Sequence, residues 1–167
     1  MILKNFAITR NLDVGLYNID KVFTGLIDVK CLHKIYENSN SLQSVLAKVK
    51  IKVVDEDYYM YVDDSDGCIV VGKNHLRESD EVTLYLDIIH ELVHVKQFMD
   101  GRDIYDERYE YVDRQTEIEA YQVVVDEARK LGMNDDAIME YLKVEWVNED
   151  GLKRLANRLG VSPAKLQ

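Results

Sequence analysis

The sequence is poor in the residues that interrupt or cross-link a chain. Its 167 residues include one proline, Pro163, and two cysteines, Cys31 and Cys68. Two cysteines that are not in a CxxC spacing argue against a disulfide framework, so we expect two separate, reduced and buried thiols. No linker rich in proline, glycine or serine and no internal repeat divides the chain. We therefore predict a single domain over residues 1–167.

Long apolar runs and an excess of basic charge are also absent. The longest apolar run is far shorter than the 18 residues that a membrane helix needs, and the N-terminus lacks the basic and apolar regions of a signal peptide. These absences predict a soluble, cytoplasmic protein without membrane contact. A formal net charge of −10 argues against nonspecific binding to nucleic acid. The 47% of hydrophobic residues suffices for one proper core.

Histidine is scarce as well, and two of the four histidines stand in the run His90-Glu91-Leu92-Val93-His94. Residues four apart on a helix are separated by about 40° around the axis and about 6 Å along it, so both imidazoles can reach one metal ion. Glu91 lies about 100° from His90, where it can act on a water at the metal rather than join the ligands. This HExxH pattern predicts a hydrolytic zinc site. Two buried structural histidines are the alternative.

The helix around this motif, expected to start at Ser79 or Asp80 and to end before Gly101, is apolar over most of its circumference. Its polar residues fall on one narrow strip, whose burial is costly unless the strip binds something. The strip consists of Thr83, Asp87, His90, His94 and Gln97.

A second helix, expected from about Arg114 to Lys130, offers the third ligand. Its predicted packed face carries Glu117 followed by the small Ala120, whereas Glu119 points about 200° away toward a wetter surface. Two histidines, one carboxylate and a water complete a catalytic zinc site. We favour Glu117 as the ligand, with Glu119 as the competitor and another residue still possible.

The other elements place these helices in an α+β fold. The N-terminal residues Met1 to Tyr17 have no clear period, and a short strand or extended arm is all that they suggest. The pattern then predicts a helix from Asn18 or Asp20 to about Glu37, a short helix over Ser41 to Lys48, and strands over Val49 to Val54, Tyr58 to Val62 and Cys68 to Gly72. We expect the first two strands to form a hairpin, and an exposed edge at the third strand to pair with an extended peptide beside the metal.

Two further features have ordinary explanations. The acidic segment Asp63 to Gly67 lacks the later ligands of an EF-hand loop, so we interpret it as a solvated turn. A lone helical histidine such as His33 is more often a surface or packing residue than a ligand.

The C-terminal third is expected to consist of packing helices, from Asp135 to about Val147 and from Asp150 or Gly151 to Leu159. Residues 155–163 look like the opening of a helix-turn-helix, and residues 151–167 carry four basic residues and no acid. The chain stops where a recognition helix would be completed, so a terminal structural helix is the favoured interpretation.

The HExxH run, followed 23 residues later by Glu117-Ile118-Glu119-Ala120, resembles the gluzincin metallopeptidases over roughly residues 49–131. It looks most like the minigluzincins, the ImmA/IrrE-like peptidases and the Ste24/HtpX catalytic cores. The resemblance implies a minimal zincin-like domain, with a sheet of about three strands packed on the active-site helix and a glutamate helix. It also implies that Glu117 is the third zinc ligand. These families usually carry Asp or Asn after the alanine, where this chain has Tyr121.

The sequence thus predicts a zinc-dependent endopeptidase that acts on a peptide or protein. His90, His94 and Glu117 would hold Zn²⁺, and Glu91 would activate the metal-bound water. Tyr121 could steady a ligand histidine or polarise the substrate carbonyl, and Asp87 is a further candidate for supporting a histidine. The oxyanion donor remains open among Tyr105, Tyr109, Tyr111, Tyr121 and His75. The alternative function is a noncatalytic regulator that keeps the peptidase scaffold and binds a partner or DNA.

Overall fold

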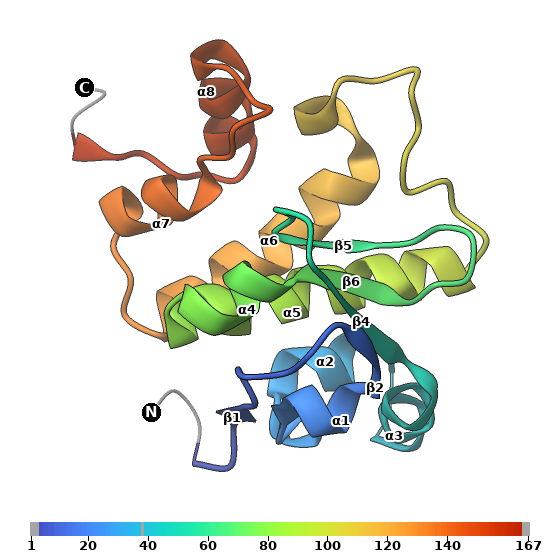
Figure 1. Ribbon diagram of the computed structural model, residues 1–167. Helices are drawn as coiled ribbons and strands as arrows, with labels where there is room; N and C mark the ends of the chain where they lie inside the picture. The colour runs from blue at the N-terminus through green and yellow to red at the C-terminus, as the bar shows by residue number, and fades with distance from the viewer. Residues whose placement is uncertain (1–3, 38, 165–167) are drawn as a thin grey trace. The chain divides into compact units, whose positions relative to one another are not determined.

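The computed structural model of the protein describes residues 4–37 and 39–164. Helices, a mixed sheet and a small antiparallel sheet share the chain, so the predicted α+β class is confirmed (Figure 1). The backbone forms two compact units, Met1–Gly101 and Arg102–Gln167. The HExxH run belongs to the first unit and Glu117 to the second. A single domain over the whole chain stays a prediction.

A four-stranded mixed sheet organises the first unit. Its order is β2 (Gly15–Asn18), β4 (Lys50–Val54), β6 (Ile69–Gly72) and β5 (Met60–Val62). Strand β4 runs antiparallel to β2 and parallel to β6, with Ile51 opposite Ile69. All four residues of β6 are buried, whereas β4 alternates between buried residues and exposed lysines. A short strand without exposed positions is typical of a sheet interior, and β6 indeed lies between two neighbours.

The pairing corrects two predictions. The strands expected at Val49 to Val54 and Tyr58 to Val62 both exist, but they do not form a hairpin with each other. Strand β5 instead pairs antiparallel with β6, so that Met60 lies opposite Val71. The strand at the predicted peptide-binding edge, β6, is internal, and β5 is the edge strand on that side of the sheet.

The N-terminal segment was more structured than its sequence indicated. Strand β2 adds a fourth strand to the predicted sheet, and β1 (Ala7–Ile8) pairs with β3 (Phe23–Thr24) in a separate two-stranded sheet. The helix predicted from about residue 20 to Glu37 is broken into α1 (Ile19–Val22), a 3₁₀ turn η1 (Leu26–Asp28) and α2 (Lys30–Ile35).

Gly25 marks the break. Its φ of 89° lies in the left-handed region, and a Cβ built there would lie 2.2 Å from the carbonyl oxygen of Asn5. The N-terminal segment therefore passes too close for a side chain at this position. Pairing with β1 draws Phe23 and Thr24 into extended backbone, and this tertiary contact overrides the helical spacing of the apolar residues.

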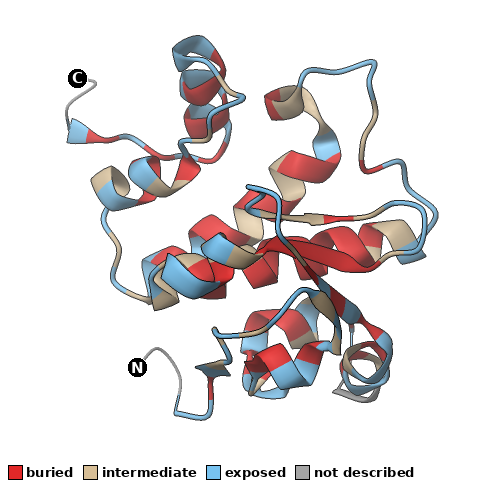
Figure 2. Cartoon of the chain, in the orientation of Figure 1, coloured by how far each residue is buried: buried red, intermediate tan, exposed pale blue. Residues whose placement is uncertain are grey.

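Three helices complete the first unit: α3 (Ser39–Lys48), α4 (Lys73–Glu78) and α5 (Glu81–Met99). Strand β6 leads directly into α4, and α5 lies against β5. Figure 2 shows β6 and much of α5 as buried, which agrees with the predicted apolar circumference of this helix. The core of this unit thus lies between the sheet and α5.

The second unit begins with a polar segment that has little regular structure before the 3₁₀ turn η2 (Tyr111–Asp113). Three helices follow: α6 (Gln115–Lys130), α7 (Asp135–Leu142) and α8 (Glu149–Arg158). Asn134 and Asn148 cap α7 and α8 by accepting hydrogen bonds from backbone N–H groups of Ala137 and Gly151. Helix α7 is shorter than predicted, because it ends at Leu142 rather than near Val147.

Within the described ranges, none of the helices combines the length and apolar character required to traverse a bilayer.

Candidate metal centre

Helix α5 carries the HExxH run, and its ends match the predicted signals. The Asp80 side chain caps the first turn by accepting a hydrogen bond from the Thr83 backbone N–H at 2.9 Å, and Gly101 follows the helix with a φ of 79°. His90, Glu91 and His94 are all buried, at 5–6% exposure each. Burial of three such polar side chains on one helix costs free energy unless they form hydrogen bonds or bind a ligand.

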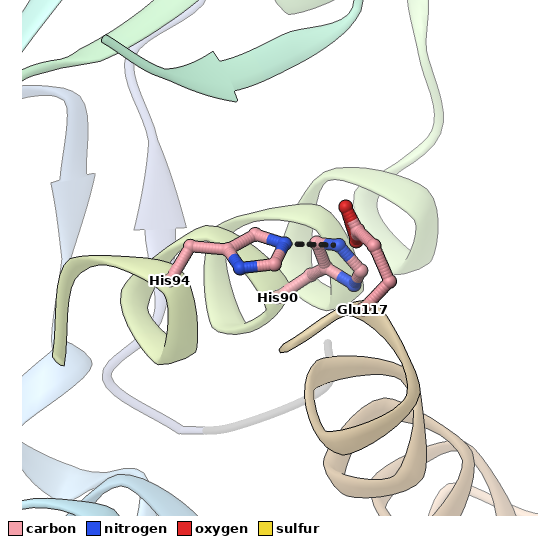
Figure 3. A group of neighbouring side chains, drawn as sticks. All are labelled: His90, His94 and Glu117. Carbon is pink, nitrogen blue, oxygen red and sulfur yellow. Dashed lines mark hydrogen bonds between the residues drawn. The ribbon is translucent and has the colours of Figure 1, made fainter. Parts of the chain in front are cut away.

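The two histidines face one another within the helix. The Nε2 atoms of His90 and His94 are 3.1 Å apart, and Figure 3 shows the two rings meeting at these atoms. Two nitrogen ligands that each lie about 2.0–2.1 Å from a tetrahedral zinc are separated by about 3.3 Å. The observed separation therefore fits two ligands of one metal ion.

Gln97 orients the second histidine. Its Oε1 atom lies 2.7 Å from Nδ1 of His94, and Gln97 is itself buried. An amide oxygen can only accept a hydrogen bond, so Nδ1 carries the proton and the neutral ring keeps its Nε2 lone pair for a metal. The sequence had placed Gln97 on the polar strip without a role. Its spacing of three residues from His94 on the same helix was the signal that could have identified it.

Asp87, a predicted support for a histidine ligand, has a different partner within the first unit. Its Oδ2 atom lies 2.7 Å from Nε2 of His75 in α4, and the Oγ atom of Ser79 lies 2.8 Å from Nδ1 of the same ring. His75 is thereby held between α5 and the residue that ends α4. These hydrogen bonds connect α4 to the polar strip of α5, because Asp87 is a residue of that strip.

Helix α6 separates the two acidic candidates for the third ligand. Glu117, in its first turn, is buried at 3% exposure. Glu119 has a partly exposed side chain that forms an ion pair with Arg102, at 2.5 Å between Oε2 and Nη1. A carboxylate already held by a surface arginine is a poor candidate for a buried ligand, so the burial pattern favours Glu117.

His90, His94 and Glu117 form a group that could hold a metal ion. One ligand atom from each lies within 4.8 Å of the others, and Figure 3 draws the three side chains. The structure thus brings together the ligand set that the sequence had favoured. Two imidazoles and a carboxylate are the donors of many catalytic zinc sites, and they leave one coordination position open.

Tyr121 lies one helical turn beyond Glu117 and is buried at 5% exposure. Its hydroxyl oxygen is 2.7 Å from that of Tyr111 in η2. Of the other tyrosine candidates, Tyr109 is exposed, and the backbone N–H of Tyr105 donates a hydrogen bond to Oδ1 of Asp103. Tyr111 was itself one of the candidate oxyanion donors, but its pairing with Tyr121 was not predicted from the sequence.

A second group of possible ligand atoms occurs in the acidic turn before β6. Asp63, Asp66 and Cys68 each offer one atom within 4.8 Å of the others. Burial, together with a hydrogen bond to Asp66, raises the pKa of the Cys68 thiol to about 11, so the thiol is protonated at neutral pH. Asp63 accepts hydrogen bonds from Ser65, as in an ordinary turn. These features agree with the predicted turn.

The remaining sequence candidates have structural partners. Nε2 of His33 lies 2.5 Å from the backbone carbonyl oxygen of Ile27, which is a packing role. Cys31 and Cys68 are buried thiols and form no disulfide in the part of the chain described. Two arginines of the basic C-terminal segment, Arg154 and Arg158, form ion pairs with Asp113.

No protein-family model, curated protein or solved structure matches the chain.

Proposed function

We propose that the protein is a zinc-dependent metalloendopeptidase in which His90, His94 and Glu117 hold the zinc ion. The observation that carries this proposal is the buried HExxH turn of α5, where the two Nε2 atoms lie 3.1 Å apart beside a buried Glu91. Two structural histidines would not need a hydrolytic carboxylate between them. The ligand chemistry of two nitrogens and one oxygen suits zinc.

When bound, zinc supplies Lewis acidity that polarises a carbonyl oxygen and lowers the pKa of a coordinated water. Glu91 takes a proton from the attacking water and passes it to the nitrogen of the departing amine, as the peptide C–N bond breaks. Gln97 keeps His94 in the tautomer that presents Nε2. The products are one carboxylic acid and one amine, so a single water balances the reaction.

Strand β5 provides a way to hold an extended substrate. It is an edge strand of the sheet, and it lies against α5. A peptide that pairs with this edge would be held by backbone hydrogen bonds, which demand no particular sequence. This arrangement suits an endopeptidase, because neither end of the substrate chain needs to be recognised.

The alternative, a noncatalytic protein that binds DNA through its basic end, has less support. Arg154 lies 2.6 Å from Glu110, and Arg158 lies 2.5 Å from Asp113, so these charges are paired within the second unit. The intact Glu91 also favours an enzyme, since a scaffold without activity has no need of a general base.

The test combines metal content with hydrolysis of casein or a peptide library. We expect about one zinc per chain, loss of metal in His90→Ala, and retained metal without hydrolysis in Glu91→Gln, because the base is not a ligand. A protein that takes up no zinc at neutral pH, or a Glu91→Gln variant that cleaves at the parent rate, would contradict the proposal.

Glu117→Ala and Glu119→Ala form a matched pair for the third ligand. Loss of a ligand carboxylate should weaken zinc binding by more than the 10- to 100-fold that is typical of changes around the ligands, whereas loss of the Arg102 ion pair should leave it within about twofold. The opposite result would assign the ligand to Glu119.

A further inference from the structure

Ser79, His75 and Asp87 form a chain of hydrogen bonds in which no metal ligand takes part. The Ser79 Oγ atom lies 2.8 Å from Nδ1 of His75, and Nε2 of the same ring lies 2.7 Å from Oδ2 of Asp87. A hydroxyl, an imidazole and a carboxylate in this order are the parts of a serine nucleophile site, where a base touches the nucleophile and a third group orients the base. All three residues belong to the first unit.

The end of α4 brings the hydroxyl to the imidazole ring. Ser79 directly follows α4, four positions after His75, and its backbone N–H donates to the His75 carbonyl oxygen at 3.1 Å. Residues four apart around a helical turn lie on the same face, so the two side chains can meet. Asp87 lies in the second turn of α5 and contacts the far side of the ring from that helix.

The carboxylate fixes the directions of these hydrogen bonds. An ionised Asp87 can only accept, so the neutral ring carries its proton on Nε2 and presents the lone pair of Nδ1 to Ser79. The Ser79 hydroxyl therefore donates to a nitrogen that can take its proton. The side chains of His75 and Asp87 are 9% and 18% exposed, whereas Ser79 is half-buried. The base and its orienting group are thus shielded more than the residue that carries the nucleophile.

A cation is anchored on the residue that carries the hydroxyl. Nη1 of Arg10 donates to three carbonyl oxygens at the end of α4, those of Leu76, Arg77 and Ser79, at 3.3, 3.4 and 2.5 Å. Within residues 4–37 and 39–164, Nε and Nη2 of this guanidinium take part in no hydrogen bond. A positive charge with further donors beside a nucleophile stabilises the oxyanion that forms when a carbonyl is attacked.

We propose that Ser79 is a nucleophile that accepts acyl groups from small carboxylic esters. His75 takes the hydroxyl proton as Ser79 Oγ bonds to the carbonyl carbon, and it gives that proton to the departing alcohol as the ester C–O bond breaks. A water then releases the acyl group by the reverse transfers, so that one ester and one water yield one acid and one alcohol. Asp87 is a positioning residue, because it holds the tautomer of His75. This activity requires no metal and goes beyond the proposed peptidase function.

The charges near Ser79 narrow the class of ester. Three acidic residues, Glu78, Asp80 and Glu81, lie within two positions of Ser79 in the sequence, against one base, Arg77. This balance repels an anionic acyl group. We therefore assign uncharged acyl groups to the site.

The test is covalent labelling of the full chain with a fluorophosphonate, whose phosphorus bonds to an activated serine oxygen as fluoride leaves. We expect one label per chain, located on Ser79 by mass spectrometry. His75→Gln should slow labelling by about 10²- to 10⁴-fold, the usual contribution of a general base. Asp87→Asn should slow it by about 10-fold or more but still reach one label per chain, because an amide that donates to Nε2 leaves the proton on Nδ1. A variant that misfolds would instead lower the final extent.

A chromogenic ester tests turnover and the class of substrate. p-Nitrophenyl acetate should release a rapid burst of one nitrophenol per chain from the parent, because the acyl group stays on Ser79 until water removes it. Ser79→Ala should show no burst. The hydrogen succinate ester, which carries an anionic acyl group, should react more slowly than the acetate, and an equal or faster reaction would reject the assigned class.

Ser65→Ala and His33→Gln are matched controls. The Ser65 Oγ atom donates to Oδ1 of Asp63 at 2.6 Å, and Nε2 of His33 lies 2.5 Å from the Ile27 carbonyl oxygen, so each residue has a comparable hydrogen bond elsewhere in the first unit. Both variants should be labelled on Ser79 within about twofold of the parent rate, as expected for surface substitutions.

Two results would overturn the inference. One is a parent protein that acquires no label on Ser79, and the other is a folded His75→Gln variant that is labelled as fast as the parent. Circular dichroism of every variant establishes that it is folded. Labelling involves no metal, so its outcome does not depend on whether the protein is a peptidase.

Discussion

Replacing Gln97 with leucine should weaken zinc binding while the helix around it remains folded. The Oε1 atom of Gln97 accepts the Nδ1 proton of His94 at 2.7 Å, and Gln97 is only 4% exposed. Leucine has a similar size but no acceptor, so this partner of the ring is lost and water has little access to replace it. A buried hydrogen-bonding group that loses its partner costs about 1–3 kcal/mol.

The same magnitude follows from the chemistry of metal sites. Partners that orient a histidine ligand typically contribute 10- to 100-fold to metal affinity, which corresponds to about 1.4–2.8 kcal/mol. The affinity loss in Gln97→Leu should fall in that range. Gln97→Glu, which keeps an oxygen acceptor at the same place, should bind zinc at least as tightly as the parent.

Competition with a chromophoric zinc chelator at neutral pH measures these affinities. Gln122→Leu is the matched control, because Gln122 donates from Nε2 to Asp126 at 3.0 Å on an exposed part of α6. It should bind zinc within about twofold of the parent, as surface substitutions usually do little. A Gln97→Leu protein that binds zinc equally well would refute the inferred tautomer and the role of Gln97.

Two further predictions concern the folded chain. Gly25→Ala should lower the free energy of unfolding, measured in urea, by about 2 kcal/mol or more, because the added Cβ would meet the Asn5 carbonyl oxygen and an alanine would have to adopt a left-handed backbone. Gly101→Ala is the control and should cost less, because Gly101 also has a left-handed φ of 79° but no atom lies within 4 Å of the added carbon. Equal losses in the two variants would contradict the close approach at Gly25. The hydrogen bond from Arg158 lowers the pKa of Asp113 below its usual 3.8, so the stability that this carboxylate contributes is complete above that value and is lost as the pH falls below it. The difference in unfolding free energy between the parent and Asp113→Asn should therefore be constant from pH 7 to about 5 and shrink toward pH 2, and a difference that already changes between pH 7 and 5 would refute this assignment.

Helix α5 could be predicted from local sequence signals alone. Its apolar circumference, the Asp80 cap and Gly101 after its end were all readable in the sequence, and the helix runs from Glu81 to Met99 as expected. These signals are local, because a helix is made of contacts between residues at most four positions apart. The opposite directions of Glu117 and Glu119 follow from the same periodicity, and their different burial agrees with it.

The order of the strands in the sheet could not be predicted from local sequence signals. The strand at residues 60–62 was expected to pair with the strand before it, yet it pairs with the strand after it, and β4 runs parallel to β6. Strand pairing depends on which distant segments meet, and alternation within a strand identifies only its faces. The all-buried pattern of β6 was a signal for an internal strand that the sequence interpretation did not use.

The sequence by itself determined which residues could bind a metal, which carboxylate lies between the histidines, and that these residues lie on helices whose faces can be predicted. Only the tertiary structure decided three hydrogen-bonded pairs: Gln97 with His94, Asp87 with His75, and Tyr121 with Tyr111. The physical reason is the range of the interactions. Helical periodicity acts over a few residues, whereas the partner of a buried polar side chain depends on how distant segments pack, and every such group must find one to be buried at low cost.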